Sequence, residues 1–206
     1  EILMKKIIIN IGRQFGCGAK DVADAIGRRT GIPVYDSELL KKAAQDFGFS
    51  ESLFSGSDEK KRCFSLSSIF NSNIFGCSSM NDDASLFAMQ AEAIKNIARN
   101  GSAIIIGRAA NYILRDCDCC LNVFLTSPIE ERAKRVAERE NMDREKALEH
   151  IERMEKEREA YYNTFTFGNW GMASTYDLCV DTSLLGVEGT ADLILEFAKK
   201  TGKYEA

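Results

Sequence analysis

Short apolar runs alternate with longer amphipathic stretches along the chain, and this alternation predicts an α/β fold. The first run, from Ile7 to Ile11, is β-branched and has the length of a strand. Comparable runs follow at 34–35, 102–106, 121–125 and 178–180. Strands that are apolar throughout belong in a sheet covered on both faces. We therefore expect a mainly parallel five-stranded sheet with helices on both faces.

Apolar residues at helical spacing mark the helices between these strands. The pattern predicts helices at 21–29, 39–44, 84–99, 128–140, 149–161 and 188–200. Gly31 and Asn100 suit helix ends, and Pro128 suits a first helical turn. Asp36 and Ser37 offer N-cap oxygens to the second helix.

The segment 47–83 has a different texture, because Ser, Asn, Gly and Phe are interspersed and no periodicity is sustained. Its phenylalanines, among them Phe54 and Phe70, argue against a plain disordered linker. We interpret the segment as an insertion, a flap or an acceptor-side subdomain over a site. A surface that contacts a partner is the alternative.

A glycine-rich stretch, KKIIINIGRQFGCGAK, joins the first strand to the first helix. Gly12, Gly16 and Gly18 allow a backbone whose amides turn inward on an anion, and the helix start adds its positive end. The standard phosphate-loop pattern GxxxxGK[ST] is not matched, since Ala19 stands in the lysine position and Lys20 comes one residue late. Taken alone, the stretch fits a phosphate cradle and an ordinary strand-to-helix turn equally well.

Polar or glycine residues follow several predicted strands, and they favour the phosphate interpretation. Gly12, Tyr35, Gly107 and Thr126 all stand at carboxyl ends of strands. In a parallel sheet these ends lie at one edge, where ligands gather.

Arginines recur along the predicted helices that follow Pro128. Arg132, Arg135 and Arg139 share one helix face because they are three and four residues apart. Most charges here fit a solvated helix pair. The functional interpretation is a lid over 128–165 that brings Arg132, Arg153 and Arg158 onto a phosphoryl group.

Composition narrows the classes of function. The net charge of -4 argues against a nucleic-acid-binding module, and no apolar run is long enough to cross a bilayer, so the cytoplasm is the expected location. The 7 cysteines have no repeated spacing and are interpreted as reduced thiols. Cys117, Cys119 and Cys120 cluster, but no second CxxC or histidine pair completes a metal site. His150 is the sole histidine, which makes a histidine-based triad improbable.

The ordered set of motifs resembles the cytidylate-kinase-like family, a branch of the P-loop nucleoside monophosphate kinases. The resemblance rests on GRQFGCGAKDVA, IPVYDSELL, IIIGRAANYIL, VFLTSPIEERAKRV, IERMEKEREAYY, NWG and YDLCVDTS, and covers most of the chain outside 47–83. It implies one P-loop kinase-like domain over 1–206, a three-layer sandwich with an arginine-bearing lid. It also implies transfer of a phosphoryl group from ATP, with Mg²⁺, to a nucleoside monophosphate such as CMP or dCMP.

The resemblance implies roles for individual residues. The donor phosphates would be held by Gly12, Arg13, Gly16, Cys17, Gly18, Ala19, Lys20 and Asp21, and Asp21 is also the expected metal-side carboxylate. The acceptor would be bound by Asp36, Ser37, Lys42, Arg108 and Arg153, with Lys42 where cytidylate kinases carry an arginine. The catalytic residues would be Lys20, Arg132 and Arg158. Either Lys20 or Arg13 would supply the charge of the usual loop lysine.

Two classes of function follow from these residues. The first is an ATP-dependent kinase of a nucleoside monophosphate or of another small molecule. The second is a nucleotide-binding regulator that kept the fold and lost transfer, as the altered loop indicates. A purely structural role remains the third alternative. The expected partners are nucleotides and a second copy of the chain as a homodimer, and neither nucleic acid nor membrane is expected.

Overall fold

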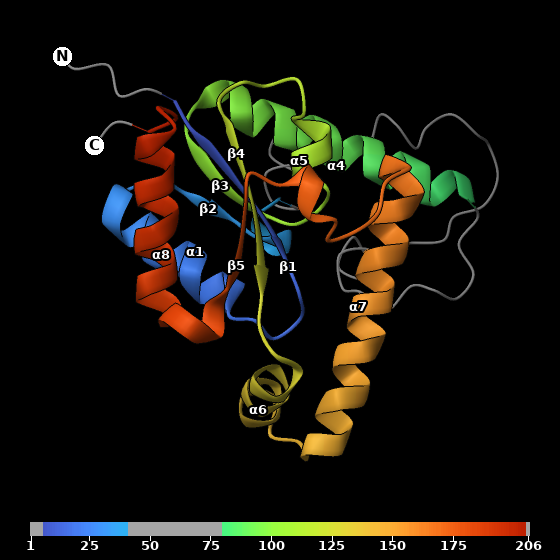
Figure 1. The fold of residues 1–206 in the computed structure, drawn as a ribbon. Coiled ribbons are helices and arrows are strands. Elements are labelled where there is room, and N and C mark those ends of the chain that lie inside the picture. The colour runs from blue at the N-terminus through green and yellow to red at the C-terminus, as the bar shows by residue number, and fades with distance from the viewer. Residues whose placement is uncertain (1–5, 41–79, 205–206) are drawn as a thin grey trace.

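The computed structural model describes residues 6–40 and 80–204, and its centre is a five-stranded sheet in which every strand pairing is parallel. The strands are β1 (Ile8–Arg13), β2 (Val34–Tyr35), β3 (Ala103–Ile106), β4 (Cys120–Thr126) and β5 (Leu178–Asp181). Their order is β2-β3-β1-β4-β5, so β1 lies in the middle (Figure 1). The prediction of a parallel α/β sheet is confirmed.

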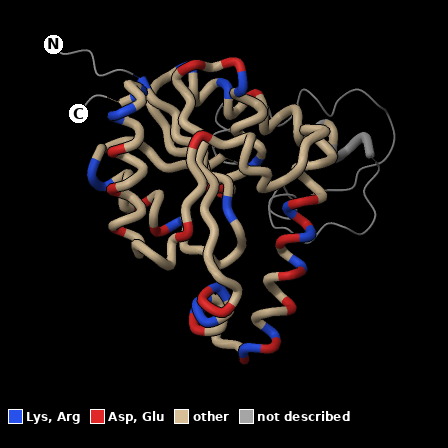
Figure 2. The backbone as a smooth tube through the Cα atoms, viewed as in Figure 1, with Lys and Arg blue, Asp and Glu red and all other residues tan. Residues whose placement is uncertain are grey.

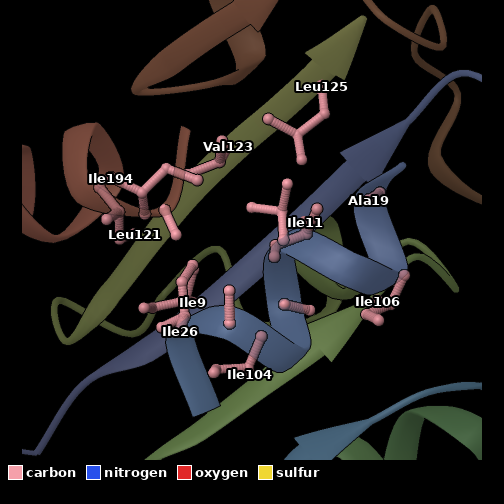
Figure 3. Close-up of a cluster of buried hydrophobic side chains, with 14 of the residues drawn as sticks. Ile9, Ile11, Ala19, Ile26, Ile104, Ile106, Leu121, Val123, Leu125 and Ile194 are labelled. Atoms are coloured by element: carbon pink, nitrogen blue, oxygen red, sulfur yellow. The ribbon is translucent and has the colours of Figure 1, made fainter. Parts of the chain in front are cut away.

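One face of the sheet is covered by α1 (Ala19–Thr30) and α8 (Thr182–Lys200). Alternate residues of β1, β3 and β4 point into this layer, where Ile26 of α1 and Ile194 of α8 pack against Ile9, Ile104 and Leu121 (Figure 3). Because these side chains are fully buried, their packing fixes the positions of the end of β1 and the start of α1.

The other face is covered by α4 (Met80–Asn100) and the short α5 (Ala110–Ile113). Ile8 and Ile105 point to this side and pack against Ile94 of α4 and Ile113 of α5. Both faces of the central strands are therefore largely apolar, which explains why the strands form nearly continuous apolar runs rather than alternating patterns. The polar exceptions are Asn10 and Asn122, and the amide of Asn10 donates to Asn122 at 2.9 Å.

Helices α6 (Ile129–Glu140) and α7 (Arg144–Thr166) extend beyond the carboxyl edge of the sheet (Figure 1). Charged residues are dense on both helices, whereas the strands carry few (Figure 2). The two helices pack on each other through Ala133, Val136, Ala147 and Ile151, and Phe15 of the loop after β1 joins this cluster. A 3₁₀ turn, η1 (Ala173–Thr175), then leads to β5.

The predicted helices are present with extended limits, except that the helix after Ser37 is described only to Leu40. Helix α8 begins six residues before the predicted start at Glu188 and is kinked at Gly186. Helix α5 was not predicted. Lys42 and nearly all of 47–83 lie outside the described residues. No helix of the described ranges is both long and apolar enough to span a membrane.

Candidate functional site

The loop between β1 and α1 has the backbone shape of an anion cradle. Gly16 and Gly18 take φ values of 80° and 81°, in the left-handed region that glycine favours. Gly18 caps α1 without any side-chain hydrogen bond, so the first amides of the helix have no capping side chain. Free amides at the positive end of a helix are a ready site for phosphate.

Neighbouring elements hold this loop in place. The hydroxyl of Thr182, at the start of α8, donates to the carbonyl oxygen of Cys17 at 2.6 Å. On the opposite side, a Cβ on Gly16 would lie 2.9 Å from Val136 and 3.1 Å from the carbonyl oxygen of Arg132, so α6 packs directly on the loop. The loop is therefore fixed in shape before any ligand binds.

Three arginines from separate elements meet beside the loop. Arg13 ends β1, Arg108 follows β3, and Arg158 lies on α7, where its guanidinium donates to the carbonyl oxygen of Arg13 at 3.3 Å. Burial lowers the pKa of Arg13 well below its usual value, and the charges of Arg158 and Arg108 lower it further. Burial also lowers the pKa of Arg158 to about 10. Each positive charge in this group makes the charged form of the others less favourable. The group is therefore suited to bind an anion that neutralises these charges.

The backbone after β3 is shaped to bring Arg108 into this group. Gly107, Arg108 and Ala109 have φ values of 76°, 56° and 53°, three left-handed residues in succession. Left-handed conformation costs non-glycine residues on the order of 1–3 kcal/mol each and is concentrated at functional sites. Gly107 also makes room for Arg13, because a Cβ there would lie 1.7 Å from Arg13 Nη1.

Arg132 lies under the loop rather than in the arginine group. Its side chain is 6% exposed and pairs with Glu155 of α7 at 2.8 Å. The same guanidinium donates to the carbonyl oxygens of Ser127 at 2.8 Å and Phe15 at 3.2 Å. Arg132 therefore connects the loop, the end of β4 and α7.

Phe15, at the tip of the loop, is a ring platform for other side chains. The guanidinium carbons of Arg158 and Arg139 lie 5.0 and 5.4 Å from its centroid. The ring of His150 meets it edge-on at 5.0 Å. These contacts couple the position of α7 to that of the loop.

Lys20 has carboxylate partners instead of cations around it. Its ammonium group lies 2.9 Å from Asp24 and 3.5 Å from Asp36, and its side chain is 51% exposed. The hydrogen bond that Lys20 donates to Asp24 is the main cause that raises the pKa of Lys20. Asp36 also accepts from the amides of Glu38 and Leu39, both at 3.1 Å, and so caps the helix that follows β2.

A polar and aromatic wall continues from the arginine group. The guanidinium of Arg108 lies 5.7 Å from the ring centroid of Tyr161, whose hydroxyl donates to Gln90 Oε1 at 2.8 Å. Burial raises the pKa of Tyr161 to about 12, although the charge of Arg108 opposes that rise. Asn111 of α5 donates to the hydroxyl of Tyr162 at 3.0 Å. Helices α4, α5 and α7 therefore converge here.

The structure brings most of the expected site residues to one edge of the sheet, but not all into one group. Gly12 lies within β1, where a Cβ would be 2.7 Å from Phe124, so its lack of a side chain also serves packing. Arg153 is exposed and lies 2.7 Å from His150, away from the other arginines. The other expected residues lie at the loop, at α1 or just after β2: Arg13, Cys17, Ala19, Asp21 and Ser37.

Sequence reasoning missed Gln90, Tyr161 and Phe15. Gln90 and Tyr161 are 71 residues apart in the chain, so no local pattern connects them. For Gln90 a signal was present, because a polar residue on the buried face of an otherwise apolar helix indicates a partner.

The interpretation of all cysteines as reduced thiols is wrong for Cys117 and Cys119, which form a disulfide. Their separation of two residues was too short to suggest it.

Comparison with known proteins gives one family. The model of the cytidylate kinase-like family matches residues 8–184. A cytidylate kinase of Methanocaldococcus jannaschii is 34% identical over 48% of this chain and 56% of that protein, and one of Pyrococcus horikoshii is 35% identical over 47% and 50%. The chain thus spans about half the length of these curated relatives. A cytidylate kinase of Methanopyrus kandleri is 27% identical over 91% of each chain.

Solved structures agree with the topology. An uncharacterized protein from Eubacterium ventriosum superposes with a TM-score of 0.72 at 28% identity, covering 94% of this chain and 99% of that one. A shikimate kinase from Aquifex aeolicus superposes with a TM-score of 0.54 at 17% identity, covering 95% and 98%. The second similarity extends to the fold alone.

Proposed function

The chain belongs to the cytidylate kinase-like family, and on that premise we propose that it transfers the γ-phosphoryl group of ATP to a nucleoside monophosphate, CMP or dCMP. The observation that carries the proposal is the group of Arg13, Arg108 and Arg158 beside a glycine loop with an uncapped helix start. Phosphoryl transfer needs positioning and neutralisation of charge more than it needs a strong base.

The reaction assigns a role to each part of this edge. A phosphate oxygen of the acceptor attacks the γ-phosphorus, the bond to the bridging oxygen breaks, and ADP leaves with that electron pair. The amides of the loop and of the α1 start hold the donor. Arg108 orients the acceptor phosphate, while Arg13 and Arg158 neutralise charge on the group in transfer. Asp21 would hold Mg²⁺, which when bound neutralises the donor phosphates.

Helices α6 and α7 would act as the lid. Arg158 reaches the site from α7, and Arg132 links α7 to the loop through Glu155. Movement of α7 would therefore carry Arg158 toward or away from the phosphates. Arg153 would join the acceptor only after such a movement, because it now contacts His150.

Two buried atoms without partners support a cytosine-like acceptor. Gln90 Nε2 and Glu157 Oε2 have no hydrogen-bond partner among the described residues, and Gln90 is 1% exposed. Glu157 lies one helical turn before Tyr161, the partner of Gln90. The edge of cytosine offers an amine that donates and ring atoms that accept, whereas uracil has a carbonyl in place of the amine. One amide donor with one carboxylate acceptor therefore complements cytosine.

A coupled assay of ADP release over CMP, dCMP, UMP, AMP and GMP tests the proposal. We expect the largest kcat/KM with CMP or dCMP, and folded protein that is silent with all five would refute the function. Glu157→Gln replaces an acceptor with a donor and should lower the ratio of CMP to UMP turnover by about tenfold. Glu159→Gln, on the exposed side of α7, is the matched control.

A nucleotide-binding regulator is the second candidate, and the surroundings of Lys20 favour it. That lysine is paired with Asp24 and Asp36, so it does not stand free for a phosphate. Under this alternative, ATP raises the melting temperature while no acceptor is turned over. A measurable transferase rate that Arg108→Met abolishes would exclude it. A homodimer and a cytoplasmic location stay predictions.

A further inference from the structure

A second cluster of reactive side chains lies at the other end of the sheet. Cys117, Cys119 and Cys120 have Sγ atoms that all lie within 4.8 Å of one another, and within the described ranges no other group of three potential metal ligands is so close. Cys120 begins β4 and Thr126 ends it beside the phosphate loop. At about 3.3 Å per residue, the cluster is roughly 20 Å from that loop.

The backbone fixes the three cysteines in a tight turn. The amide of Cys120 donates to the carbonyl oxygen of Cys117 at 3.1 Å, which closes a four-residue turn. The amide of Cys117 donates to Leu114 at 2.9 Å, and the carbonyl oxygen of Cys119 accepts from Ile8 at 3.0 Å. The turn is thus tied to α5 on one side and to β1 on the other. Main-chain hydrogen bonds therefore hold this turn in addition to the disulfide between Cys117 and Cys119.

Two of the three cysteines are accessible from solvent. Cys117 and Cys119 are half-buried, whereas Cys120 is 4% exposed. The ammonium group of Lys203 donates to the carbonyl oxygen of Cys120. A cation could approach from the side of Cys117 and Cys119 and reach the buried sulfur last.

We propose that this three-cysteine turn, once reduced, binds one soft metal cation of the Zn²⁺ class through three thiolates. Thiolate sulfur is the ligand that selects such cations over Mg²⁺ or Ca²⁺, and zinc leaves a fourth position for water or a nearby carboxylate. The exposed Asp118 lies within the turn. No second pair of cysteines is required, because the turn itself supplies three ligands.

The structure contains the oxidised form, in which Cys117 and Cys119 are joined and their Cα atoms lie 5.4 Å apart. An added phosphine reduces that disulfide to two thiols and becomes the phosphine oxide, whose oxygen comes from water. Each of the three thiols then loses its proton to buffer as its sulfur binds the cation. Disulfide and bound metal therefore exclude each other.

Titration of the full chain with Cd²⁺, a spectroscopic probe for zinc thiolate sites, tests the proposal. In phosphine-reduced protein we expect thiolate-to-metal charge-transfer absorption that saturates at one cation per chain. Protein kept oxidised should show no such absorption, although its sequence is unchanged. Cys117→Ser/Cys119→Ser should abolish it, and these half-buried positions leave the buried Cys120 in place.

Cys179→Ser is the matched control, because Cys179 is a free, exposed thiol on β5. It should keep the full signal and stoichiometry. The proposal is overturned if the double variant, folded by circular dichroism, still binds one Cd²⁺ with the same absorption, or if reduced wild type shows none. Kinase activity does not enter the test, so it stands apart from the proposed function.

Discussion

Replacing Arg158 by methionine should make the ligand-free protein more stable while it weakens phosphate binding. Burial is the main reason that the pKa of Arg158 falls to about 10. A folded pKa below the unfolded one means that folding disfavours the charged form, so the penalty is fully present below about pH 10 and fades as pH rises toward the unfolded pKa. At about 1.36 kcal/mol per unit, the penalty at pH 7 is about 3 kcal/mol.

Other contacts of Arg158 reduce the net gain. Methionine loses the hydrogen bond to the carbonyl oxygen of Arg13 and the cation–π contact with Phe15, each about 0.5–1 kcal/mol. The unfolding free energy should then rise by about 1–2 kcal/mol, or roughly 2–8 °C in melting temperature for a chain of this size. Methionine keeps most of the apolar stem against the ring, so no large cavity opens.

Thermal melts at pH 7 with and without tripolyphosphate measure both effects. Wild type should be stabilised by the anion, and Arg158→Met should start higher and respond by less than half as much. Lys156→Met is the control, because that side chain is 72% exposed and its ion-pair partner among the described residues is Glu152 on the same helix. The reasoning is refuted if Arg158→Met melts lower than wild type without ligand, or if its tripolyphosphate response equals that of Lys156→Met.

Three further substitutions test the scaffold of the site. Gly107→Ala places a Cβ 1.7 Å from Arg13 Nη1, so kcat/KM should fall at least about tenfold and urea unfolding should show a loss of about 1–3 kcal/mol. Arg132→Met removes the cationic partner of Glu155, which still accepts from the Phe15 amide at 3.4 Å, and should cost about 3–5 kcal/mol in the same urea assay, whereas replacing both by methionine should recover most of it. Thr182→Val removes the 2.6 Å hydrogen bond to the loop and should raise the KM for ATP about threefold with little change in kcat.

The sheet could be predicted from the sequence because strands that are buried on both faces are recognisable as apolar runs. Ile7 to Ile11, apart from Asn10, and Ala103–Ile106 are apolar runs, since one set of side chains meets α1 and the other meets α4. No comparable sequence pattern indicates the order of the strands. It depends on which runs pair, and Val34–Tyr35 is too short to indicate that it lies next to β3. Helix α5 was missed because its four residues are too few to show a helical spacing of apolar positions.

The site could be predicted only in part, because its residues are brought together by tertiary contacts. Spacing put Arg132, Arg135 and Arg139 on one helix face, yet spacing does not distinguish a buried anchor from a ligand contact. Glu155, the ion-pair partner of Arg132, is 23 residues away from it in the chain. The position of Arg108 depends on three successive residues in the left-handed conformation. No periodicity in the sequence indicates that conformation. The Gly107 that makes room for Arg13 is recognisable only once both strands are adjacent.

The displaced lysine of the loop is better understood through its partners than through its position. Lys20 already has two carboxylates, so an arriving phosphate must compete with Asp24 and Asp36 for it. Burial and then the charges of Arg158 and Arg108 lower the pKa of Arg13, and a phosphate relieves the repulsion between these cations as it binds. The same anion therefore gains more at Arg13 than at Lys20. Arg13 is for this reason the residue that we propose in place of the usual loop lysine, and the variant loop then needs no lysine at its standard position.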